Sequence, residues 1–279
     1  MGTLYLVATP IGNLEDISAR ALRILGSSHL IAAEDTRQTL KLLNHFHIHT
    51  PLMSYHEHNK RVRTGEVLAA LQEGDVALVS DAGTPALNDP GYELVRAAVQ
   101  AGYLVSPIPG PCAPVAALVA SGLPADAFLY LGYLPRKAAE RKRFLQNVAD
   151  LPYTLVFFET PHRLLDALVD LQQVLGDRSL AVARELTKIH EEIFRGVCSQ
   201  ARAYFVDGEQ RGEFTLVVAG KATGKDRWSE AEVRQELLST LVAREPAAVL
   251  ANRVARQSGW PRREIYQMVV QMQQAAAQE

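Results

Sequence analysis

The chain has 279 residues, of which 48% are hydrophobic, and its formal net charge is −2. This length provides for two domains with packed cores, and the balanced charge excludes a long basic tail or an acidic disordered arm. Two cysteines, Cys112 and Cys198, give no disulfide framework, which fits a reducing cytosol. The sequence shows no leader pattern and no membrane-length apolar run, so we predict a cytoplasmic protein without a membrane partner.

Residues 1–121 alternate short apolar runs with helical patterns, which predicts a parallel sheet covered by helices. The predicted strands are Leu4–Ala8, Leu30–Ala33, Leu52–Tyr55, Val76–Val79 and Leu104–Ile108. The predicted helices are Ile17–Leu25, Thr36–Phe46, Lys60–Leu71, Gly91–Ala101 and Ala113–Ser121. The last helix is expected to close this domain, before a linker at 122–124.

Residues 125–221 are predicted to form a second α/β domain. Its strands are expected at Phe128–Gly132, Thr154–Phe158, Leu180–Ala183, Glu192–Gly196 and Phe214–Ala219. Helices are expected over Lys137–Ala149 and from Pro161 to about Leu175. Helices do not separate the last three strands regularly, which indicates a mixed sheet.

Residues 228–279 form a third predicted domain, which contains only helices. Ser229–Glu232 has the capping-box pattern. Two helical patterns, Ala247–Gln257 and Arg262–Gln273, flank a turn at Gly259. This arrangement fits a helix-turn-helix unit and equally a plain helical hairpin.

Three turns rich in Gly and Pro follow predicted strands, at Thr9–Asn13, Ser80–Gly91 and Pro109–Ala113. In open α/β sheets ligands bind beyond the carboxyl ends of the strands, so three such turns predict one ligand site built largely from backbone. The GxxxxGK[ST] and GxGxxG patterns are missing, which disfavours nucleoside triphosphates and dinucleotides.

Several ordered motifs resemble the tetrapyrrole-methylase superfamily, and within it the branch that methylates a cytidine ribose in small-subunit ribosomal RNA. They are Thr9-Pro-Ile-Gly-Asn-Leu-Glu-Asp16, Ala33-Glu-Asp-Thr-Arg37, Ser80-Asp-Ala-Gly-Thr-Pro85, Pro109-Gly-Pro-Cys-Ala113, Phe157-Phe-Glu-Thr-Pro-His-Arg163 and Ala183-Arg-Glu-Leu-Thr-Lys188.

The resemblance implies S-adenosylmethionine in a cleft between the two α/β domains, no metal, a homodimer, and 16S rRNA in the small ribosomal subunit, near the decoding region, as substrate. The implied cofactor contacts are Ile11, Ala82, Gly83, Thr84, Leu87, Cys112, Ala113, Glu159 and Leu186.

Two other functions stay open. A tetrapyrrole C-methyltransferase is disfavoured because Ala8–Asn13 and Ala82–Pro85 lack the acids of the superfamily's usual GxGPGD-like and GGDP-like turns. A non-catalytic RNA- or DNA-binding protein is disfavoured because it would not need three organised turns.

Methyl transfer to a ribose hydroxyl is a direct displacement, which a base would assist. Acids and a lysine near the predicted cleft are the candidates: Glu34, Asp35, Asp81, Glu159, Glu185 and Lys188. We select Asp35, Asp81 and Glu159 as the catalytic set. Asp35 with Arg37 also fits an acidic cap at a helix N-terminus, and the sequence does not separate the two roles.

Several residues are candidates for RNA contact, although a solvated helix face explains the basic clusters equally well. They are Arg37, Tyr55, His56, Arg136, Lys137, Arg262 and Arg263. His45, His47 and His49 lack the spacing of usual zinc sites, and we expect them on a solvated or RNA-facing surface.

Overall fold

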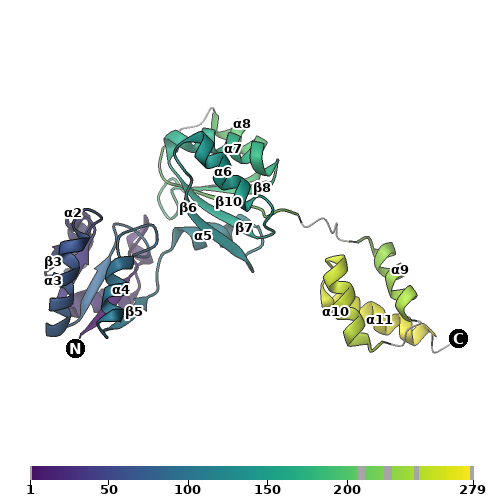
Figure 1. Ribbon diagram of the computed structural model, residues 1–279, viewed down its shortest axis with the longest axis horizontal. Coiled ribbons are helices and arrows are strands. Elements are labelled where there is room, and N and C mark those ends of the chain that lie inside the picture. The colour runs from purple at the N-terminus through teal and green to yellow at the C-terminus, as the bar shows by residue number, and fades with distance from the viewer. Residues whose placement is uncertain (1, 207–210, 223–227, 242–244, 277–279) are drawn as a thin grey trace. The chain divides into compact units, whose positions relative to one another are not determined.

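The computed structural model describes residues 2–206, 211–222, 228–241 and 245–276 and has two compact units, Met1–Gly220 and Lys221–Glu279. Within the described residues, the first unit holds two sheets with their helices, and the second holds helices alone (Figure 1). This confirms the predicted fold class. Positions 242–244 and 277–279 of the third predicted domain lie outside the described residues.

The first sheet is parallel throughout, with the strand order β3-β2-β4-β1-β5. Its strands are β1 (Thr3–Val7), β2 (Leu30–Ala33), β3 (Leu52–Ser54), β4 (Val76–Val79) and β5 (Leu104–Ile108). Its helices are η1 (Leu14–Asp16), α1 (Ala19–Ser27), α2 (Thr36–His45), α3 (Lys60–Glu73) and α4 (Tyr92–Gln100). Side chains of β4 alternate between two cores: Val76 and Leu78 pack with α3 and α4, and Ala77 and Val79 with α1 and α2.

The chain reverses its direction across this sheet between the neighbouring strands β2 and β4. From β2 it continues through α2 to β3 at one edge, and from β4 it continues through α4 to β5 at the other edge. The two helices lie on opposite faces, because α2 belongs to one core and α4 to the other. Such a reversal opens a crevice at the carboxyl ends of the two strands, where α/β proteins bind ligands.

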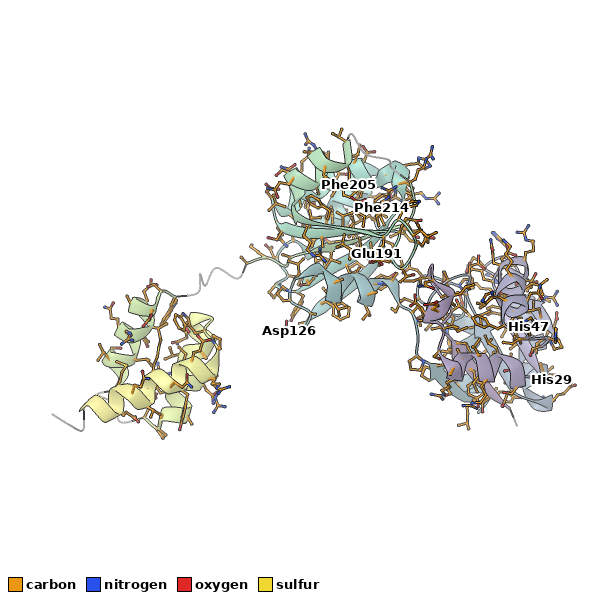
Figure 2. All side chains as sticks on the ribbon, turned by 180° about the vertical axis from the view of Figure 1, so that it is seen from behind. His29, His47, Asp126, Glu191, Phe205 and Phe214 are labelled. Carbon is orange, nitrogen blue, oxygen red and sulfur yellow. The ribbon has the colours of Figure 1, made fainter. Side chains whose placement is uncertain are left out.

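The second sheet is mixed, with the order β6-β7-β10-β8-β9, and only β6 and β7 pair in parallel. Its strands are β6 (Phe128–Tyr133), β7 (Thr154–Glu159), β8 (Ser179–Arg184), β9 (Glu192–Val197) and β10 (Phe214–Val218). One face carries α6 (Ala138–Val148), α7 (Leu164–Leu175) and α8 (Cys198–Val206), and the short η2 (Pro161–Arg163) precedes α7. The rings of Phe205 on α8 and Phe214 on β10 meet edge to face at 5.9 Å in this core (Figure 2).

The helix α5 (Ala113–Ser121) differs from the prediction in where it packs. We expected it to close the first domain, but its buried Ala117 and Leu118 lie against Val156 and Val217 of the second sheet. It covers the face opposite α6, α7 and α8 (Figure 1). The reason is that this face would otherwise expose its apolar side chains, and small residues on α5 allow close contact.

The second unit folds around a core of its own. Its helices are α9 (Glu230–Leu241), α10 (Ala247–Ser258) and α11 (Arg262–Ala276). The predicted capping box is present: Ser229 N donates to Glu232 Oε2 at 2.7 Å, and Glu232 N donates to Ser229 Oγ at 3.3 Å. Val233 of α9 joins Leu250 and Ile265 in one cluster, so the predicted hairpin is part of a three-helix core. None of the described helices is long and apolar enough to cross a membrane.

Candidate functional site

One pocket lies at the carboxyl ends of β2 and β4 and is bounded on its other side by residues of the second sheet. Its volume is about 250 Å³. All nine residues for which the sequence predicts cofactor contact line it: Ile11, Ala82, Gly83, Thr84, Leu87, Cys112, Ala113, Glu159 and Leu186. The fold therefore brings together residues that are up to 175 positions apart in the chain. Their contact with a cofactor stays a prediction.

The three predicted turns form one continuous wall of this pocket. Thr9 N donates to Gly83 O at 2.9 Å, and Gly83 N donates to Thr9 O at 3.0 Å. Thr84 Oγ1 donates to Pro111 O at 3.1 Å, which joins the second turn to the third. Gly83 has φ +81°, and a Cβ there would lie 3.3 Å from Ile11 Cγ2, so this wall is shaped by the absence of a side chain.

Strained backbone borders the pocket on both sides. Ala86 and Asn88 on the first wall have φ of 66° and 65°, and Glu185 and Thr187 on the second have φ of 51° and 65°. Each pair flanks a leucine that lines the pocket. Non-glycine residues rarely adopt this conformation, and such strain gathers at functional sites.

The second wall is formed by side chains of the mixed sheet, and it contacts the first. The rings of Tyr133 and Phe158 lie 5.4 Å apart and line the pocket. Tyr130 Oη donates to Asn88 Oδ1 at 2.8 Å, a direct bond between the walls. A Cβ on Gly12 would lie 2.4 Å from Lys188 Cγ, so this glycine permits the close approach of the first turn to the second wall.

The pocket is acidic. Five carboxylates line it, and no lysine or arginine does among the residues that the structure describes; the acids are Glu34, Asp81, Asp89, Glu159 and Glu213. Burial is the largest cause that raises the pKa of Glu34, Asp89 and Glu159. Such a lining attracts positively charged groups and repels phosphates.

Comparison with known proteins assigns the chain to a family. The sequence profile described as "Tetrapyrrole (Corrin/Porphyrin) Methylases" matches residues 3–202. A protein from Synechocystis named "Ribosomal RNA small subunit methyltransferase I" is 50% identical over 277 residues, which are 98% of this chain and 99% of that protein. The chain belongs to this methyltransferase family.

A second family member, from Thermotoga maritima, bears the same name and is 47% identical over 222 residues. The alignment takes up 100% of that protein but 79% of this chain, which is the share of the first unit, 220 of 279 residues. A family member can therefore be about as long as the first unit alone.

Solved structures share the fold at low sequence identity. A uroporphyrin-III C-methyltransferase from Thermus thermophilus, solved with S-adenosyl homocysteine, superposes with a TM-score of 0.53 at 20% identity and covers 79% of this chain and 98% of that chain.

The pocket residues fit the S-adenosylmethionine that the family resemblance implies. That molecule carries a sulfonium and an ammonium group, which the acidic lining favours. Its adenosyl part needs apolar contact, and the lining includes the apolar side chains Ile11, Leu87 and Leu186.

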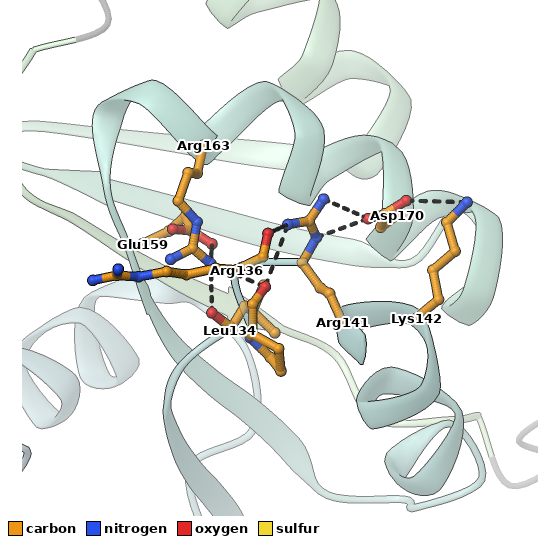
Figure 3. Close-up of polar contacts among 8 residues, drawn as sticks. Leu134, Arg136, Arg141, Lys142, Glu159, Arg163 and Asp170 are labelled. Carbon is orange, nitrogen blue, oxygen red and sulfur yellow. Dashed lines mark hydrogen bonds and ion pairs between the residues drawn. The ribbon is translucent and has the colours of Figure 1, made fainter. Parts of the chain in front are cut away.

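Glu159 lies on the second wall and takes part in a network of charged residues there (Figure 3). Its Oε1 accepts from Thr160 N at 2.8 Å, and its Oε2 pairs with Arg163 at 3.3 Å. Arg163 also donates to the carbonyls of Leu134 and Pro135. The Glu159 side chain is fully buried. Both of its oxygens are thus engaged, although burial still raises its pKa.

A second arginine, Arg141, is buried and holds the same loop (Figure 3). Arg141 pairs with Asp170 at 2.6 Å, and its Nη1 donates to Pro135 O at 3.4 Å and to Arg136 O at 3.2 Å. The side chains of Arg136 and Lys137 are exposed beyond the fixed carbonyls. The two arginines therefore fix the segment 134–136, which follows the pocket residue Tyr133. This segment carries the predicted RNA contact Arg136 and leads directly into the second one, Lys137.

Asp35 caps a helix and does not line the pocket. Its side chain accepts from Arg37 N at 2.9 Å and pairs with the Arg37 guanidinium at 2.6 Å. These contacts, that with the Arg37 side chain first, lower the pKa of Asp35 to about 2. The capping role left open by the sequence is present. Asp81 does line the pocket, and its Oδ1 accepts from Asp35 N at 2.9 Å.

One predicted RNA contact is inconsistent with the structure. Tyr55 is fully buried, and its hydroxyl lies 3.1 Å from Thr64 Oγ1, so its ring cannot stack on a base. The apolar ring fills the core beneath α3, which a single sequence did not reveal. The neighbouring His56 is partly exposed and contacts Asn59. Arg37, Arg262 and Arg263 are exposed, and their contact with RNA stays a prediction.

The histidines do not form a metal site within the described residues. His45 ends α2, and His47 adopts φ 55° in the following turn (Figure 2). His45, His47 and His49 are all exposed, as expected.

Proposed function

We propose that the protein binds S-adenosylmethionine in the acidic pocket and transfers its methyl group to the 2′ hydroxyl of a cytidine in 16S rRNA, in the decoding region. The observation that carries this proposal is the near full-length similarity to a protein named for small-subunit rRNA methylation. The acidic pocket at the carboxyl ends of β2 and β4 supports it, because the methyl donor is a cation.

The chain's own residues have two tasks in this reaction. When bound, the cofactor supplies an activated methyl group that passes to the acceptor oxygen by direct displacement. The turns joined through Thr9, Gly83 and Thr84 would hold the donor in one orientation, since alignment of donor and acceptor is the main requirement of such a step. The pocket acids would balance the positive charge until it is lost.

Labelled S-adenosylmethionine and small ribosomal subunits that lack the modification test the proposal. We expect the label on the 2′ oxygen of one cytidine, located by nuclease digestion and mass spectrometry. Methylation of a porphyrin precursor, with no label on rRNA, would establish the tetrapyrrole alternative instead. Binding of RNA without any methyl transfer would establish a non-catalytic binding protein.

The remaining partner assignments belong to the same proposal. We propose a homodimer in the cytoplasm, with the exposed Arg136, Lys137, Arg262 and Arg263 on the backbone of the rRNA. The Thermotoga maritima relative, which is about as long as the first unit, supports a methyl-transfer site in that unit. We propose that the second unit adds to RNA binding.

A further inference from the structure

Glu34 lies at the crevice between β2 and β4, where the chain leaves the sheet toward opposite edges. It is the first residue after β2, and Asp81 lies in the corresponding loop after β4. These two strands are neighbours, and the chain leaves them toward opposite edges of the sheet. Glu34 lines the pocket and is partly exposed, so a ligand in the crevice can reach its carboxylate.

The other acids that the sequence predicts as catalytic are less suited to accept a proton. Asp35 is held by Arg37 at 2.6 Å and lies outside the pocket lining. Glu159 is fully buried and bonded through both oxygens. Asp81 is exposed to water, and its Oδ1 accepts from Asp35 N at 2.9 Å.

The surroundings of Glu34 raise its pKa above that of an ordinary surface glutamate. Burial is the largest cause of its raised pKa, followed by repulsion from Asp89 and Asp81, while a backbone hydrogen bond from Asp81 opposes the rise and Asp35 adds a little to it. Asp89 itself has a raised pKa, mainly from burial. The second wall faces the same pocket with the titratable groups Tyr133, Glu159 and Glu213.

We propose that Glu34 is the base that takes the proton of the acceptor hydroxyl. This inference rests on the proposed function. The hydroxyl oxygen forms its bond to the methyl carbon while the carbon–sulfur bond breaks, and that electron pair passes to sulfur, which leaves as neutral S-adenosylhomocysteine. The hydroxyl proton moves to the Glu34 carboxylate and is then released to water.

The pH dependence follows from this role. A base must be ionised to act, so kcat/KM for S-adenosylmethionine rises with pH through the pKa of Glu34 in the enzyme before the cofactor binds. Because that pKa is raised, the acidic limb of the profile lies above the range of an ordinary glutamate. Asp89→Asn removes the strongest repulsion on Glu34, and the limb should then move to lower pH.

The experiment compares Glu34→Gln with wild type on small subunits, with Glu73→Gln as a matched control. Glu73 lies at the exposed end of α3, paired with His29 at 3.2 Å. We expect Glu34→Gln to lower kcat on the order of 100-fold or more and to abolish the acidic limb. The calorimetric affinity for S-adenosylmethionine should fall by much less than kcat, because four lining carboxylates remain, and Glu34→Asp should restore part of the rate. The control should match wild type.

A second readout needs no catalysis. In protein labelled with carboxyl-¹³C glutamate, the NMR signal missing from Glu34→Gln should titrate above an ordinary glutamate, and Asp89→Asn should lower that value. The role of Glu34 would be overturned, and the proposed function kept, if wild type is active and Glu34→Gln is equally active. The same holds if weaker cofactor binding explains the loss of activity in Glu34→Gln. A wild type that does not methylate rRNA would overturn the proposed function itself.

Discussion

The two walls of the pocket are built from different materials. The first wall is backbone: Thr9 and Gly83 exchange hydrogen bonds, and Gly83 holds a left-handed conformation. The second wall depends on buried charges, with Glu159 paired to Arg163 and Arg141 paired to Asp170. The first wall thus depends on glycine at position 83, which leaves space in the pocket. The second depends on ion pairs that hold the segment 134–136.

This difference determines how each wall can fail. A wall made of backbone has few side chains that a substitution could remove. A larger side chain placed on it should change the shape of the pocket with little effect on the rest of the fold. A wall of buried ion pairs should fail through stability, because removing one partner leaves the other charge buried without compensation. Changes on the two walls should therefore separate into losses of binding and losses of folding.

The largest effect on binding is expected for Gly83→Val. The new side chain meets Ile11 Cγ2, which a Cβ alone would approach to 3.3 Å, and it closes part of the pocket. Gly122→Val is the matched control, since Gly122 has φ +80° and a Cβ there has no atom within 4 Å. Both variants should lose at least about 1–2 kcal/mol of folding stability, because valine is placed in a left-handed backbone conformation. In calorimetry we expect S-adenosylmethionine binding to be lost in Gly83→Val alone; equal binding in the two would place the cofactor elsewhere.

The largest effect on stability is expected for Arg141→Met. It leaves Asp170, whose side chain is 6% exposed, with Lys142 at 3.4 Å as its remaining cation. We expect a loss of about 3–5 kcal/mol in urea unfolding, and Asp170→Leu in the same chain should restore much of it. As a control, Arg63→Met breaks the exposed pair with Glu66 and should cost no more than about 1 kcal/mol. Similar losses in the two single variants would show that the buried pair does not hold the wall.

The backbone wall was predictable from sequence, because Gly and Pro mark turns locally and the strands before them are short apolar runs. The order of those turns along the chain was enough to predict one site. The pairing of Arg141 with Asp170 was not predictable, since the partners are 29 positions apart and each alone reads as a solvated charge.

Other differences have the same origin in tertiary contact. The apolar run of α5 predicts a helix but not which sheet it covers, and its side chains pack on the second sheet. The helix α8 was not predicted, although Cys198, Ala201 and Phe205 are buried at helical spacing. Tyr55 has an aromatic ring that could stack on a base, and only the packing of α3 shows that this ring belongs to the core.

The smallest effect is expected where the second wall presents Arg136 and Lys137 to solvent. Replacing both by Ala removes two charges but leaves the Arg136 carbonyl available to Arg141 and the Pro135 carbonyl available to Arg163. If each side chain contacts a phosphate, the slope of log affinity for rRNA against log salt should fall by about 1 per residue. Arg262→Ala with Arg263→Ala gives the same measurement for the second unit. Cofactor affinity should not change in either double variant. An unchanged slope for one pair would mark it as a solvated surface, so the comparison shows which part of the molecule holds the RNA.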